Sequence, residues 1–276
     1  MNNAQPVLNY YNLSDDVKAF STTRHGGVSE GNYASLNINE YCGDSKANTD
    51  ANRLLLANEL GIDANHIIMP HQTHGVESRI IGEEFATLPD GVKKMLLEGV
   101  DAVMTNIPGI CIGVSTADCI PVLLYDEEHH AAAAIHAGWR GTQARIVHKA
   151  VQEMRMAYQT NPTKLKAVIG PGISLDNFEV GDEVYADFEQ AAFDMSTIAE
   201  ERIKRNPNAD DPTKAFERKW HINLPLANIQ MLTHNGVDEA NILNTGICTF
   251  DNADNYFSAR RLGIESGRIY TGIIIR

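Results

Sequence analysis

Four short apolar segments follow one another closely in the middle of this chain, at residues 100–105, 110–115, 120–125 and 131–136. Runs of this length separated by turn residues are typical of buried β-strands. The gaps between them are too short for the crossover helix that parallel neighbours need. The sequence therefore predicts an α+β fold with mixed or antiparallel sheets, and not a doubly wound parallel one.

Helical patterns flank these strands, and further strands lie near both ends of the chain. The expected helices are 45–60, 92–98, 142–158, 224–235 and one within 178–193. The other expected strands are 17–22, 165–169, 269–275 and a strand, a turn and a strand within 65–81. The charged stretch 200–219 predicts an exposed excursion. With no repeat and no clear boundary, residues 1–276 are predicted to form one domain.

Charge and composition exclude several classes of protein. A net charge of -13 argues against a general nucleic-acid binder, which needs a basic face. There is no apolar run long enough to cross a bilayer, and the first residues lack a basic segment followed by an apolar one. The four cysteines are scattered without a CxxC pair, which favours reduced thiols. We therefore expect a cytoplasmic protein that binds neither nucleic acid nor membranes.

Cys119 comes directly before the third apolar segment, and His136 ends the fourth. If these segments form a hairpin, the start of one lies beside the end of the other, so that a thiolate and an imidazole meet as two ligands of a metal site. Taken singly, each has a simpler explanation, since a lone Cys is usually a small buried hydrophobe. The carboxylate of Asp118 beside the thiol, and Arg140 in a Gly-rich turn that Thr142 would cap as a helix begins, favour a functional site that accepts an anion.

At these residues the chain resembles a known family. The segments TADCIPVLLYD and AAIHAGWRGT are similar to the signature of the laccase-domain family, also called the YfiH-like or multicopper polyphenol oxidase family, some of whose members are described as purine nucleoside phosphorylases. STTRHGGVSEGNYASLNI, HQTHGVE, IGPGIS, FEVGDEVY, YFSARR and SGRIY resemble the family in the same order. The resemblance implies a four-layer α/β/β/α sandwich and a metal-dependent enzyme.

The resemblance also implies the third metal ligand. Within HQTHGVE, the family's pattern of Gln, any residue, His and Gly selects His74, and leaves His71 as a residue behind the ligands or facing the substrate, with Gln72 beside it. One sulfur and two nitrogens, from Cys119, His74 and His136, suit zinc or copper. Three protein ligands leave a fourth position for water or substrate.

Other residues are implied as substrate contacts. Arg24 and Asn37 of the first motif, and Arg260 of YFSARR, are expected to bind the substrate or an anion, together with Arg140, His71 and Gln72. We expect Arg24 to hold the phosphate or the sugar of a nucleoside and to take part in catalysis. Asp118 is the candidate acid or base.

Three functions remain open. The first is phosphorolysis of inosine, guanosine or adenosine, or of methylthioadenosine, with phosphate as second substrate and with a further adenosine deaminase activity. The second is a copper-dependent polyphenol oxidase, although ten histidines without one HxH pair argue against a cluster of several coppers. The third is a non-catalytic metal-binding protein, in which Cys248 or His71 would close the site as a fourth ligand. A monomer or a homodimer fits each of them.

Overall fold

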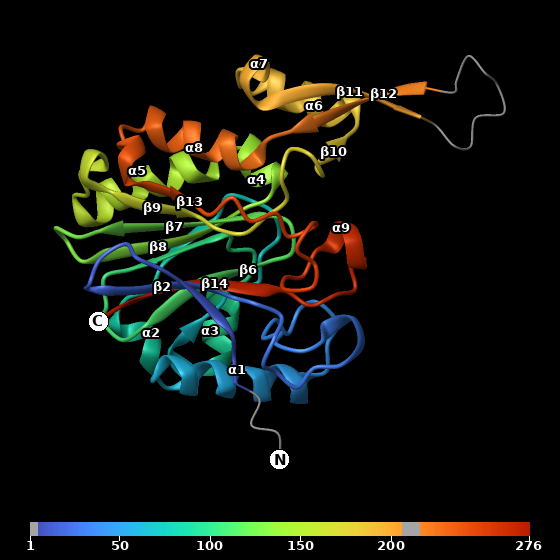
Figure 1. Cartoon of the computed structure of the whole chain (residues 1–276). Helices are drawn as coiled ribbons and strands as arrows, with labels where there is room; N and C mark the ends of the chain where they lie inside the picture. Colours follow the sequence, from blue (N-terminus) through green and yellow to red (C-terminus); the bar gives the residue numbers. More distant parts are fainter. Residues whose placement is uncertain (1–4, 206–215) are drawn as a thin grey trace.

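Two sheets stacked face to face form the centre of the protein (Figure 1). The computed structural model describes residues 5–205 and 216–276. The six-stranded sheet has the order β13-β9-β7-β8-β5-β4, and the five-stranded sheet the order β1-β2-β14-β6-β3. Helices α4, α5 and α8 cover the outer side of the first, and α1, α2 and α3 lie beyond the second. This is the predicted α+β architecture with four layers.

The bounds of the elements are as follows. The six-stranded sheet contains β4 (Ser78–Ile80), β5 (Ala102–Thr105), β7 (Ile120–Asp126), β8 (Ala131–Ala137), β9 (Lys166–Ile169) and β13 (Ile242–Asn244). The five-stranded sheet contains β1 (Leu8–Tyr11), β2 (Val17–Thr22), β3 (Ile67–Ile68), β6 (Cys111–Thr116) and β14 (Ile269–Ile275). The helices around them are α1 (Lys46–Leu60), α2 (Glu83–Thr87), α3 (Asp90–Leu96), α4 (Trp139–Gln143), α5 (Ile146–Tyr158), α8 (Leu224–His234) and the short α9 (Ala259–Leu262).

The predicted central strands are apolar along their whole length because both faces of each are covered. In β7, Leu123 and Tyr125 pack between the two sheets, whereas Val122 and Leu124 belong to the cluster that includes Val151 of α5. A strand buried on both sides needs apolar residues at every position. The core therefore lies in layers above, between and below the sheets.

Strand pairing is mixed, as expected. The β7–β8 hairpin is antiparallel, with Ile120 opposite Ala137 and Pro121 opposite His136. β5 also pairs antiparallel with β8, while β4 with β5 and β13 with β9 are parallel. The hairpin register brings the residue before β7 next to the end of β8, which is the arrangement predicted for Cys119 and His136.

Two connections carry the chain from one sheet to the other. β3 belongs to the five-stranded sheet and β4 to the six-stranded sheet, so the segment 69–77 crosses between them. The segment 117–119 does the same between β6 and β7. Both crossings contain residues of the predicted site.

The helix predicted at 142–158 is wrong at its start. The chain forms α4, then passes through Arg145 at φ 63°, and only then begins α5. Thr142 is not an N-cap, because it lies inside α4, whose N-cap is Gly138. The helix expected at 92–98 begins at Asp90 instead, and α2 before it was not expected. The helix predicted at 45–60 is confirmed, with Ser45 as its cap.

A three-stranded sheet extends away from the body (Figure 1). It contains β10 (Glu179–Val180), β11 (Ala199–Arg205) and β12 (Phe216–Ile222), and the adjoining helices are α6 (Asp182–Gln190) and α7 (Met195–Ile198). Most residues of β11 are exposed, as expected for the excursion 200–219, while its middle, 206–215, lies outside the described residues. None of the helices described here is long and apolar enough to span a membrane.

Candidate metal centre and its cavity

Three donor atoms meet where the two sheet crossings come together. The ligand atoms of His74, Cys119 and His136 all lie within 4.8 Å of one another. His74 comes from the crossing between β3 and β4, Cys119 from the crossing between β6 and β7, and His136 from β8. Within residues 5–205 and 216–276, no other group of three His, Cys, Asp or Glu residues is arranged in this way. The sequence prediction named the same three residues.

Asp101, which the sequence reasoning missed, holds two of these ligands in place. His136 Nδ1 lies 2.7 Å from Asp101 Oδ1, and the same oxygen accepts a hydrogen bond from the backbone N–H of His74 at 3.0 Å. Oδ2 accepts one from the N–H of Gly75 at 2.7 Å. Asp101 is fully buried. A polar residue at the start of a buried strand was the only signal in the sequence.

The charge of Asp101 fixes the proton on His136. Burial alone would raise the pKa of Asp101, but the hydrogen bond and charge of His136 and the N–H groups of Gly75 and Thr73 lower it overall. A carboxylate accepts hydrogen bonds only, so Nδ1 of His136 carries the proton. Nε2 is thereby left as the ligand atom, as in other metal sites where a carboxylate orients a histidine.

Cys119 and His136 stabilise each other's charged forms. Burial opposes charge on both groups, but the attraction and hydrogen bond between them outweigh it, with a further contribution from His74 to Cys119. The pKa of Cys119 falls to about 6, and that of His136 rises to about 9. Cys119 is therefore a thiolate at neutral pH, which is the form that binds a metal.

The backbone leaves room for an ion beside these atoms. A Cβ at position 138 would lie 3.0 Å from Cys119 Sγ and 3.1 Å from His74 Cδ2. Gly138 keeps this space open. The donor set of one thiolate and two imidazoles, and the free space next to it, fit zinc or copper with one coordination position left for another ligand.

The three donors open into a cavity of about 820 Å³. Besides the three donors, the cavity is lined by four further residues predicted from the sequence and by several that were not. The predicted ones are His71, Gln72, Asp118 and Arg260, and the others include Asn39, Tyr41, Ser115, Trp139, Phe178 and Arg268. A space of this size accommodates a nucleoside-sized molecule together with a second small substrate.

His71 and Gln72 are held on the wall of the cavity. His71 Nδ1 lies 2.8 Å from Glu98 Oε1, and its ring stacks on Tyr41 with the ring centroids 4.1 Å apart. Gln72 Nε2 donates to Ser115 O at 2.9 Å, and its Oε1 accepts from Ser115 N at 2.8 Å. Gln72 therefore ties the crossing at 69–77 to the end of β6.

Asp118 and Arg260 are linked to each other. Asp118 Oδ2 accepts a hydrogen bond from the backbone N–H of Arg260 at 2.7 Å, and Oδ1 accepts one from Thr249 Oγ1 at 2.7 Å. The guanidinium of Arg260 donates to Glu179 O at 3.1 Å. Asp118 therefore holds the start of α9 against the cavity.

Three of the predicted substrate residues are not among those that line the cavity. Arg24 donates from Nε to Ala34 O at 2.9 Å and from Nη1 to Ala253 O at 2.7 Å, and so joins two loops. Arg140 is exposed and stacks over Trp139 at 4.2 Å. Asn37 lies behind the cavity.

Asn37 supports Arg268, which the sequence reasoning also missed. Asn37 is fully buried, and its Oδ1 accepts a hydrogen bond from the backbone N–H of Arg268 at 3.1 Å. The guanidinium of Arg268 donates to three carbonyl groups of its own loop, Ile264 O, Ser266 O and Gly267 O. Because carbonyl and amide groups are uncharged, they do not neutralise the positive charge of Arg268.

Cys248 and Cys111 are not part of the group of three donors. Cys248 is buried, as expected, and its Sγ accepts hydrogen bonds from Ser174 N and Asn177 Nδ2. Cys111 is in the core, where burial raises its pKa to about 12.

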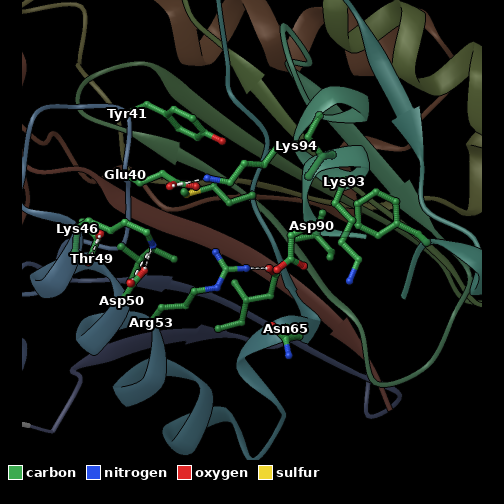
Figure 2. Close-up of a pocket in the computed structure, with 16 residues that line it drawn as sticks. Glu40, Tyr41, Lys46, Thr49, Asp50, Arg53, Asn65, Asp90, Lys93 and Lys94 are labelled. Carbon is green, nitrogen blue, oxygen red and sulfur yellow. Dashed lines mark hydrogen bonds and ion pairs between the residues drawn. The ribbon is translucent and has the colours of Figure 1, made fainter. Parts of the chain in front are cut away.

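A second cavity of about 250 Å³ lies between α1, α3 and the loop that carries Tyr41 (Figure 2). Tyr41 lines both cavities. In the second, Lys94 of α3 forms an ion pair with Glu40 at 3.0 Å, and Lys46 with Asp50 at 2.8 Å. The loop of Tyr41 is thereby tied to α3.

Comparison with known proteins places the chain among relatives of similar length. Residues 18–276 match the family described as multi-copper polyphenol oxidoreductase laccase. A purine nucleoside phosphorylase of Bacteroides thetaiotaomicron is 42% identical over 271 residues, which cover 98% of this chain and 96% of that protein. Adenosine deaminase RL5, from an unknown prokaryotic organism, is 41% identical over 266 residues, covering 96% and 97%.

Solved structures of similar proteins show the same fold over nearly the whole chain. The hypothetical protein YfiH of Bacillus licheniformis superimposes with a TM-score of 0.85 and 25% identity, covering 98% of this chain and 97% of that one. YlmD of Geobacillus stearothermophilus gives a TM-score of 0.80 at 25% identity, covering 96% and 94%.

Proposed function

The chain belongs to the family described as multi-copper polyphenol oxidoreductase laccase, and from this membership and the geometry of the cavity we propose that it is a metal-dependent purine nucleoside phosphorylase. Its substrates are inosine, guanosine or adenosine, with methylthioadenosine as a further candidate, and phosphate. The observation that carries the proposal is a group of one Cys and two His that leaves a coordination position free. This group lies in the same cavity as two guanidinium groups. The names of the two relatives described above point to the same class of substrate.

The residues of the cavity suit phosphorolysis. In this reaction an oxygen of phosphate forms a bond to C1′ of the ribose, and the bond from C1′ to N9 breaks with its electron pair remaining on the purine. Arg260 and Arg268 bind backbone carbonyls, and in the described part of the chain neither forms an ion pair with a carboxylate. Their charge remains available for a phosphate. Asp118 accepts hydrogen bonds on both oxygens and is our candidate for the base.

The donor set suits zinc, with copper as the alternative. His74, Cys119 and His136 would hold the ion, which when bound supplies a Lewis acid and lowers the pKa of a bound water to about 7. Asp101 keeps His136 in the tautomer that presents Nε2. We further propose that residues 1–276 form one catalytic domain that works in the cytoplasm as a monomer or homodimer.

Deamination of adenosine is the second candidate activity. It is favoured by a single observation, the 41% identity to a protein named adenosine deaminase RL5. The same cavity would have to admit water in place of phosphate. Phosphate dependence therefore separates the two reactions.

The remaining alternatives have less support. A polyphenol oxidase fits the description of the family, yet the described residues offer one group of three donors, which suits one ion per chain. A closed structural site needs a fourth protein ligand. Cys248 and His71, the two candidates, are not part of the group of donors.

A nucleoside panel tests the proposal. Zinc-loaded protein of measured metal content is incubated with inosine, guanosine, adenosine and methylthioadenosine, with and without phosphate, and the products are identified by mass. We expect free base and the sugar 1-phosphate only when phosphate is present, namely ribose 1-phosphate from the first three nucleosides and 5-methylthioribose 1-phosphate from methylthioadenosine. Inosine formed from adenosine without phosphate would instead establish the deaminase, and no product in any metal form would refute both activities.

Two cysteine variants control for the metal. Cys119→Ala should lose bound zinc and turnover, because a ligand is removed. Cys111→Ala, which removes a buried thiol from the core instead, should keep both.

A further inference from the structure

His71 and Glu98, on the wall of the cavity, form a hydrogen-bonded pair that is suited to proton transfer. We propose that His71 is the general acid that protonates the purine base as it leaves. This inference rests on the proposed phosphorolysis and assigns a catalytic role to a residue outside the group of metal ligands.

His71 is fixed by more hydrogen bonds than the ion pair with Glu98 alone. Its Nδ1 lies 2.8 and 2.9 Å from the two oxygens of Glu98. Its backbone N–H donates to Leu97 O at 3.0 Å, and its carbonyl accepts from Gly99 N at 2.9 Å. Both the main chain and the ring are therefore fixed to the segment that follows α3.

Tyr41 provides a third restraint. The rings of Tyr41 and His71 stack at an interplanar angle of 20°. Tyr41 is held in turn, because its N–H donates to Asn39 Oδ1 at 2.6 Å and its neighbour Glu40 pairs with Lys94 (Figure 2). The imidazole thus has a fixed orientation before any substrate enters.

The hydrogen bonds of His71 leave one nitrogen for chemistry. The carboxylate of Glu98 accepts, so Nδ1 carries a proton. Nε2 has no partner in the part of the chain that the structure describes, and the residue lines the cavity. A carboxylate behind one nitrogen of a histidine stabilises the imidazolium, whose other nitrogen can then donate a proton.

Phosphorolysis needs such a donor. When the bond from C1′ to N9 breaks, the electron pair makes the purine an anion unless a proton arrives. His71 gives the proton on Nε2 to N7 of the base, which leaves neutral, and His71 itself becomes neutral. Asp118, the candidate base, takes up the proton that the phosphate loses as it becomes ribose 1-phosphate. Water then returns a proton to His71 and removes the one on Asp118, so that both groups regain their starting forms.

The competing explanation is a surface ion pair. The side chains of His71 and Glu98 are 34% and 61% exposed, and exposed pairs of this kind contribute little to stability. In that case the substitution of His71 would change stability slightly, or would reduce turnover of all substrates to the same extent.

A substrate that needs no protonation separates these explanations. In 7-methylinosine, methylation at N7 already places a positive charge on the purine ring, and the electron pair of the broken bond neutralises it, so that the base leaves neutral without an acid. His71→Gln should lower kcat for inosine by about 10² or more, the usual contribution of a general acid. The same variant should cleave 7-methylinosine at nearly the wild-type rate, with unchanged zinc content. Glu98→Gln should show the same pattern with a smaller loss on inosine.

The chain offers a matched control. His129 forms the same kind of pair through Nδ1, at 2.9 Å from Asp126, and its side chain is also 34% exposed. It lies in the turn between β7 and β8, outside the cavity lining. His129→Gln should leave the turnover of both substrates unchanged.

Two results would overturn the inference in distinguishable ways. Equal losses on inosine and 7-methylinosine in His71→Gln, with wild-type enzyme active on both, would refute the acid role alone. Wild-type enzyme that cleaves neither nucleoside in the presence of phosphate would refute the proposed function and this inference with it.

Discussion

Asp101 is a single carboxylate that organises two of the three candidate metal ligands, which come from different elements. Replacing it by Asn keeps the size but removes the charge that holds Nδ1–H of His136 and the N–H groups of the His74 turn. We expect the zinc affinity of Asp101→Asn to fall about 10–100-fold, the usual effect of losing such a partner. Competition with a chromophoric chelator measures it.

Asp126→Asn is the matched control for this prediction. Asp126 is also buried and also bonds a histidine, His129, but at the far end of the hairpin. Its zinc affinity should equal that of the wild type. An Asp101→Asn protein that binds zinc as tightly as the control would show that Asp101 serves the fold only.

The thiolate of Cys119 predicts an unusual pH profile. Its pKa is lowered from 9.0 to about 6, so in protein stripped of metal the reactive thiolate predominates above that pH. The rate of alkylation by iodoacetamide should rise through a midpoint near pH 6 and then level off. This phase should be absent in Cys119→Ala. A midpoint near 9 would contradict the mutual stabilisation of Cys119 and His136.

At the scale of the helices, the C-terminal caps of α1 and α5 lead to opposite predictions for the free energy of unfolding. α1 ends at Gly61 with φ 74°, a conformation that glycine adopts freely, whereas α5 ends at Gln159 with φ 59°. Gln159→Gly should raise the free energy of unfolding by about 1 kcal/mol, and Gly61→Ala should lower it by about as much. Urea denaturation followed by circular dichroism tests both. A loss of stability in Gln159→Gly would mean that its side chain makes a contact worth more than the strain.

The hairpin and the pairing of Cys119 with His136 could be predicted because they depend on neighbouring segments, whereas His74 was selected through the resemblance to the family. Once two apolar runs are joined by a short turn, the register that places Cys119 beside His136 follows from adjacency. The assignment of strands to sheets could not be predicted in the same way. β3 and β4 are close in sequence but belong to different sheets, and a short apolar run does not specify which partner it will pair with.

The hydrogen-bond partners of side chains that bond distant carbonyls could not be predicted from the sequence either. Arg24 was expected to contact substrate, but the carbonyls that it binds, at Ala34 and Ala253, come together only in the fold. The guanidinium of Arg268 bonds carbonyls that are close to it in sequence. The residue nevertheless lies in the cavity, because Asn37 accepts a hydrogen bond from its backbone N–H and fixes its position. An arginine motif indicates a charge without showing which groups surround it.

At the scale of the whole molecule, redox chemistry is limited because the residues that the structure describes contain one group of three donors. Reduction of oxygen to water takes four electrons, and the described residues offer one site of three ligands. We expect copper-loaded protein to hold about one ion per chain, to oxidise phenols at most weakly and to consume little oxygen, a result consistent with mononuclear ligation. Metal analysis together with an oxygen electrode measures this. Several coppers per chain with rapid oxygen uptake would favour the polyphenol oxidase.

The two crossings between the sheets also have a kinetic consequence. His74 and Cys119 each lie on a segment whose ends belong to different sheets, so neither sheet folded by itself contains the complete set of donors. A metal ion added during refolding can bind in full only after the layer of side chains between the sheets has closed. Uptake of the ion therefore marks the docking of the sheets, and it reports a late step in the assembly of the chain.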